Sequence, residues 1–152
     1  MFSRQESSKL RQEFWTTLGQ YMSPIPSAEG VPVNWINYKT GEPSISFKMD
    51  ADNKTATISV LITNNDPGIR ELYFDQLVEL KNIFNSVLGN DWVWQKNLQE
   101  GGRQVSRIYV QITGTSIFNR DDWPTLITFF KEKMIGLDEF WSNVKIAFET
   151  LR

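Results

Sequence analysis

Residues 44–63 read SISFKMDADNKTATISVLIT and contain two alternating segments that flank a polar turn. Apolar side chains stand at every second position, first at Ile45, Phe47 and Met49 and then at even-numbered positions from Ala56 onward. A period of two is typical of strands that have one covered and one wetter face. We therefore predict an antiparallel hairpin whose turn is formed by residues 51–53.

Further strands are predicted on both sides of this hairpin. Residues 31–38 form a strand-like run, and the turn-forming segment 39–43 separates it from the hairpin. Downstream, residues 92–95 alternate, a Gly-Gly pair at 101–102 supplies a turn, and residues 107–112 alternate again. The sequence thus predicts a mainly antiparallel five-stranded sheet.

Three amphipathic helices are predicted around this sheet. The first begins at the Ser3 and Glu6 capping pair, and the second lies between the capping residue Asp66 and the terminator Gly89. The third occupies residues 123–151, with a kink expected at residues 136–138. The resulting order is α-β-β-β-α-β-β-α, which we interpret as an α+β fold in a single domain over residues 1–152, with helices on one face of the sheet.

The composition excludes several classes of function. The 152 residues contain no histidine and no cysteine, although they contain six tryptophans. The usual general base near neutral pH, the thiolate nucleophile and the main zinc ligands are therefore missing. The net charge of −2 disfavours nonspecific binding of nucleic acid. No apolar run approaches the roughly 18 residues of a membrane span and no export signal is present, so we expect a cytoplasmic protein without a membrane partner.

The acidic hairpin tip, residues 50–53, invites a metal interpretation because hard cations bind clustered carboxylate and amide oxygens. The calcium-loop pattern fails, because Thr55 replaces its glycine and Leu61 replaces its bidentate glutamate. Asp and Asn are also ordinary turn residues that bond their own backbone. We predict a plain turn, and we expect no metal site, no catalytic residue and no cofactor.

The element order from Ser3 to Trp94 matches the αβββαβ core of the PD-(D/E)xK nucleases in layout. Such nucleases need an acid on the second strand and an acid-x-lysine on the third, which together hold Mg²⁺ and steady the nucleophile. Asp50 is a candidate for the first acid, but residues 54–63 contain no carboxylate. A degenerate metal-dependent phosphodiester hydrolase is therefore kept as an alternative function.

The last two strands supply candidate contact residues. Trp94 could stack a single-stranded base, although its alternation favours the core. Arg103, Arg107 and Tyr109 are expected on the polar side of the neighbouring strand, where they could contact a phosphate or an acidic partner. These four residues form the candidate site for nucleic acid or a protein partner, with a single-stranded nucleic-acid module as the second alternative.

The final helix carries more apolar residues than one sheet contact covers. Phe129 and Phe140 lie outside its main stripe and are candidates for a homodimer contact. The other interpretation is that a kink turns the second half of the helix onto a different part of the same core.

Three segments carry a resemblance to a known family: KLRQEFWTTLGQYM at 9–22, VNWINYKTG at 33–41 and LDEFW at 137–141. The chain resembles a bacterial, Bacteroidetes-type domain family of unknown function whose longer members carry a nuclease-like region before a similar domain. The resemblance implies a link to DNA metabolism or defence and supplies no catalytic residue. Our leading hypothesis is a non-catalytic interaction or regulatory module, with a homodimer as its expected assembly.

Overall fold

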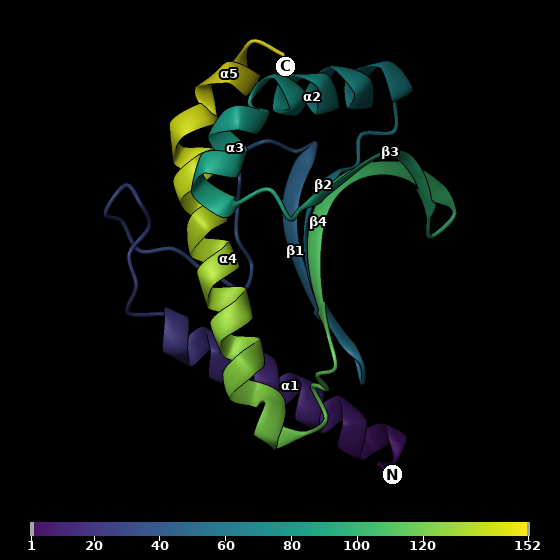
Figure 1. Ribbon diagram of the computed structural model, residues 1–152, viewed down its shortest axis with the longest axis vertical. Coiled ribbons are helices and arrows are strands. Elements are labelled where there is room, and N and C mark those ends of the chain that lie inside the picture. Colours follow the sequence, from purple (N-terminus) through teal and green to yellow (C-terminus); the bar gives the residue numbers. More distant parts are fainter. Residues whose placement is uncertain (1, 152) are drawn as a thin grey trace.

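The computed structural model describes residues 2–151 as one mixed α and β arrangement (Figure 1). Its elements are, in chain order, α1 (Arg4–Met22), β1 (Ile45–Ala51), β2 (Thr55–Ile62), α2 (Pro67–Glu79), α3 (Lys81–Leu88), β3 (Val93–Glu100), β4 (Arg103–Thr113), the 3-10 turn η1 (Arg120–Asp122), α4 (Trp123–Val144) and α5 (Ile146–Glu149).

One four-stranded sheet has the order β1-β2-β4-β3, and all of its neighbouring strands are antiparallel. The hairpin predicted from residues 44–63 is confirmed, with Ala51 opposite Ala56 at its tip and Ile45 opposite Ile62 at its base. In Figure 1 the helix α4 runs along one face of the sheet and α1 crosses its lower part. No helix of residues 2–151 covers the opposite face, around which the β3–β4 hairpin curls (Figure 1).

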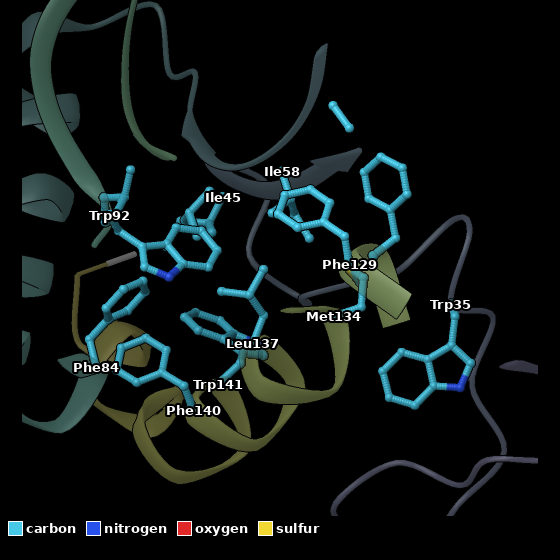
Figure 2. Close-up of a cluster of buried hydrophobic side chains, with 14 of the residues drawn as sticks. Trp35, Ile45, Ile58, Phe84, Trp92, Phe129, Met134, Leu137, Phe140 and Trp141 are labelled. Atoms are coloured by element: carbon cyan, nitrogen blue, oxygen red, sulfur yellow. The ribbon is translucent and has the colours of Figure 1, made fainter. Parts of the chain in front are cut away.

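The core lies between the sheet and α4. Alternate side chains of β2 enter it, and Figure 2 shows Ile45 and Ile58 of the sheet opposite Met134, Leu137 and Trp141 of α4. All five side chains are buried, as the period of two on the strands and the helical spacing on α4 require. Burial of apolar area of this kind is the main favourable contribution to folding.

The strand predicted at residues 31–38 is wrong, because this segment is a loop without strand pairing. Local and distant contacts hold it in that form. The Asn34 side chain accepts hydrogen bonds from the backbone N–H groups of Ile36 and Asn37, which makes a turn. The indole of Trp35 donates to the carbonyl of Ile25 at 2.9 Å. The sheet therefore has four strands instead of five, and only two precede α2, so the PD-(D/E)xK layout is not reproduced.

The helix predicted between Asp66 and Gly89 begins and ends as expected but is divided. Asp66 accepts from the N–H of Gly68 at 2.8 Å, and Gly89 has a φ of 84°. The break falls at Leu80, whose φ of −94° and ψ of 9° separate α2 from α3. The change in direction lets Phe84 pack against Trp92 with ring centroids 5.2 Å apart. Leu80 is neither glycine nor proline, so no local signal marks this break.

The last helix is not divided at residues 136–138, where a kink is predicted: α4 continues through Gly136 to Val144, and the division falls at Lys145, before α5. Gly136 has a packing role instead. A Cβ atom at this position would lie 2.5 Å from Cδ2 of Leu88, so a larger residue would push Leu88 away. The glycine thus permits the close approach of α3 to α4.

Candidate functional site

The face of the sheet opposite α4 is the candidate site, and we call it the open face. Alternation of the strands places on it Lys48 and Asp50 of β1, Thr57, Ser59 and Leu61 of β2, Val93 and Gln95 of β3, and Val105, Arg107, Tyr109 and Gln111 of β4. The β3–β4 hairpin curls around this face (Figure 1), and Val105 of β4 is only 3% exposed.

Arg107 is held in a defined position on this face. Its Nε–H donates to Oε1 of Gln95, the residue directly opposite on β3, at 2.8 Å. The guanidinium carbon lies 4.1 Å from the ring centroid of Tyr109, which is a cation–π contact. No carboxylate of residues 2–151 forms an ion pair with Arg107. Four of its five N–H groups are therefore free to bind an anionic group.

A small hollow of about 90 Å³ lies beside this guanidinium. Its lining includes Lys48 and Asp50 of β1, Ser59 of β2, and Glu100 at the end of β3. Two basic and two acidic side chains, counting Arg107, thus surround the hollow, and the local charge is balanced. An arrangement of this kind suits one anionic group and not a row of phosphates.

The structure brings together two of the four predicted contact residues. Arg107 and Tyr109 touch, whereas Arg103 lies exposed near the tip of the β3–β4 hairpin. Trp94 is half-buried and faces the helices, where its ring lies 5.3 Å from that of Phe84, so it packs against the core. Trp94 and Tyr109 are on opposite faces of the sheet and cannot form one stacking platform.

Phe129 and Phe140, the predicted dimer contacts, are inside this chain. They are 7% and 1% exposed, and Phe140 packs edge-on against Phe84 of α3 with ring centroids 5.1 Å apart (Figure 2). The extra apolar width of the last helix is thus covered by α3 and the sheet. A second copy of the chain finds almost no exposed surface on either side chain.

The acidic hairpin tip is a turn, as predicted. Oδ1 of Asp52 accepts from the backbone N–H groups of Lys54 and Thr55, each at 2.8 Å. These hydrogen bonds hold the pKa of the Asp52 carboxyl below its usual range. Across residues 2–151 no three His, Cys, Asp or Glu side chains lie in a group that could hold a metal ion.

A buried carboxylate that the sequence analysis did not single out holds the long loop after α1. Asp138 is 3% exposed on α4, where it accepts from the hydroxyl of Tyr38 at 2.6 Å and from the N–H of Ala28 at 2.7 Å. Burial, followed by the hydrogen bond and charge of Asp138, raises the pKa of Tyr38 well above its usual value. An acid that continues an apolar helical stripe between Leu137 and Trp141 is the signal that could have revealed this anchor.

Comparison with family models assigns the chain to a family. A family model described as a domain of unknown function, DUF4268, matches residues 10–145. The chain belongs to this family. The matched range includes Arg107 with its contacts Gln95 and Tyr109, and Asp138 with its partner Tyr38. Both groups therefore lie within the family's domain.

Searches of curated proteins and of solved structures found no match to the chain. Within residues 2–151, none of the helices combines the length and the apolar character needed to cross a membrane. The family description states no activity, and the function must be argued from the site.

Proposed function

We propose that this chain is a non-catalytic interaction module that binds an acidic group of a protein partner on the open face of its sheet. The observation that supports the proposal is that the Arg107 side chain is held in position but has no ion-pair partner among the described residues. Its position is set by Gln95 and Tyr109. A positioned arginine loses little side-chain entropy when it binds a carboxylate through two parallel hydrogen bonds.

The charges of the open face favour an acidic protein over a nucleic-acid strand. Asp50 and Glu100 lie close to Lys48 and Arg107, so the face lacks the basic surplus that follows a phosphate backbone. Arg107 covers one face of the Tyr109 ring, which leaves a base at most the other face for stacking. The chain as a whole carries a net charge of −2.

The carboxylates support a binding role over a hydrolytic one. Asp52 is committed to its turn and Asp138 to Tyr38 and Ala28. Asp50, the candidate first acid of a nuclease site, shares its hollow with Lys48, Arg107 and a single further carboxylate, Glu100. The resemblance to a bacterial family whose longer members carry a nuclease-like region supports a partner in DNA metabolism or defence, and we propose that the module acts in the cytoplasm.

The test is fluorescence anisotropy with two labelled probes, a glutamate-rich peptide and a short oligo-dT strand. We expect the peptide to bind, and Arg107→Gln to weaken its binding about tenfold through loss of a charge-assisted bidentate contact. Arg4→Gln, an exposed arginine on α1, is the matched control and leaves the affinity unchanged. The proposal would be overturned in favour of a nucleic-acid module if oligo-dT bound more tightly than the peptide and its affinity fell with rising salt as expected for several phosphate contacts.

A further inference from the structure

The strand β4 continues beyond the end of β3. Its residues from Arg103 to Tyr109 pair with β3 on one side, whereas residues 110–113 pair with β2 only. The chain before Val93 turns inward, where Trp92 is buried against Phe84. The far side of residues 110–113 is therefore a free strand edge, about 13 Å long at the usual rise per residue.

The backbone groups at this edge can be assigned. The N–H of Gly114 donates to the carbonyl of Lys54 at 2.9 Å, on the β2 side of β4. Because backbone groups of an antiparallel strand alternate between its two sides, those of Ile112 and Val110 also face β2. The N–H and C=O groups of Gln111 and Thr113 then face the free edge, and no protein hydrogen bond to them is found within residues 2–151.

At the opposite edge of the sheet, both ends of β1 are covered by side chains. The carbonyl of Ile45 accepts from the hydroxyl of Thr40 at 2.7 Å, and the carbonyl of Ala51 accepts from Nη1 of Arg11 at 2.7 Å. Proteins commonly cover a strand edge in this way to prevent unwanted pairing. Within residues 2–151, no side chain caps the end of β4 in this way.

A groove of about 570 Å³ lies between this free edge and the first turns of α4. Its apolar part is supplied by Val110, Ile112 and Phe129, and Thr125 and Thr128 of α4 form part of the opposite wall. A strand edge facing a helix across an apolar groove is a known arrangement for strand addition. Main-chain hydrogen bonds then supply affinity and alternate side chains supply specificity.

The charged side chains that line the groove indicate which kind of peptide sequence can bind there. Its lining contains the carboxylates of Asp91 and Glu132 and one ammonium group, that of Lys133. None of the three forms an ion pair with another described residue. The surplus of negative charge complements a basic side chain.

We propose that this groove binds an extended peptide segment of another protein, which pairs with Gln111 and Thr113 as an added strand. An apolar side chain of the segment packs toward Phe129, and a neighbouring lysine or arginine lies near Asp91 and Glu132. This site adjoins the open face, does not use Arg107, and stands independently of the function proposed above.

The test is NMR titration of the uniformly ¹⁵N-labelled full chain with an acetylated and amidated peptide, Lys-Val-Lys-Val-Lys. We expect the amide resonances of Gln111 and Thr113 to shift. The same peptide, methylated on the backbone nitrogens that face β4, keeps its side chains and is expected to bind at least about tenfold more weakly.

Two variants of exposed α4 residues complete the design. Thr128→Trp fills the groove and is expected to abolish the shifts, whereas Glu139→Trp lies outside the groove lining and is expected to retain them. Unchanged resonances of core amides show that each variant is folded, and Arg107→Gln leaves the titration unaffected.

Three results would overturn the proposal. They are the absence of shifts at Gln111 and Thr113, equal binding of the methylated peptide, and shifts that appear with rising protein concentration before any peptide is added. The last result would assign the edge to a second copy of the chain.

Discussion

Removing the hydroxyl of Tyr38 tests whether the buried anchor at Asp138 holds the long loop after α1. Tyr38→Phe deletes the 2.6 Å hydrogen bond to Asp138 and leaves the bond from Ala28 in place. A hydrogen bond to a charged acceptor contributes about 1.5–3 kcal/mol, so we expect the free energy of unfolding to fall by about 2 kcal/mol at pH 7. Urea denaturation measures this difference, and the dependence of the unfolding free energy on urea concentration should be the same for both proteins.

The pH dependence sharpens the same prediction. Burial and Asp138 raise the pKa of Tyr38 in the folded chain above its ordinary value near 10. The unfolded chain then loses its proton first, so the stabilisation is fully present below pH 10 and declines as the pH rises above it. Above pH 10 the stabilisation from Tyr38 falls by about 1.4 kcal/mol per pH unit. The difference in unfolding free energy between the native chain and Tyr38→Phe should therefore disappear near pH 11.5, about 1.5 pH units above the ordinary pKa.

Tyr21→Phe is the matched control, because Tyr21 is 62% exposed on α1 and its loss should change stability by less than about 0.5 kcal/mol. A difference between the native chain and Tyr38→Phe that stays constant from pH 7 to pH 11 would refute the reasoning. It would mean that Tyr38 ionises as freely in the folded chain as in the unfolded one.

The remaining predictions concern the packing of α4. Gly136→Leu should lower the free energy of unfolding by about 1–3 kcal/mol, because the new side chain must displace Leu88; an unchanged midpoint in urea would show that α3 and α4 do not approach closely there. Phe140→Ala should cost about 3–5 kcal/mol at every protein concentration, because Phe140 packs within its own chain. A loss that shrinks as the protein is diluted would instead indicate a contact between two copies, because dimerisation stabilises the native chain less at low concentration.

Features that depend on neighbouring residues were predictable. The alternation in residues 44–63 predicted the β1–β2 hairpin, and the Asp66 cap and Gly89 terminator predicted the outer limits of α2 and α3. The alternation in residues 107–112 likewise predicted that Arg107 and Tyr109 lie on the polar side of β4, where the structure places them. Each of these signals acts over a few residues, through backbone geometry or a single side-chain hydrogen bond.

Features that depend on residues far apart in the chain were not predictable from the sequence. The pattern of residues 31–38 suits a strand, but Trp35 binds Ile25 and Tyr38 reaches Asp138 on the last long helix, so the segment remains a loop. The division at Leu80 follows from where Phe84 packs, and the burial of Phe140 follows from the presence of α3 beside α4.

Local patterns were sufficient to establish an α+β chain with two hairpins and a polar sheet face, because strand alternation and helix caps are set by residues close together in the chain. Tertiary packing decided the number of strands, the absence of an ion pair between Arg107 and the carboxylates of residues 2–151, and the free edge of β4. These features arise from contacts between segments far apart in the chain, whose energies compete with local preference and override it.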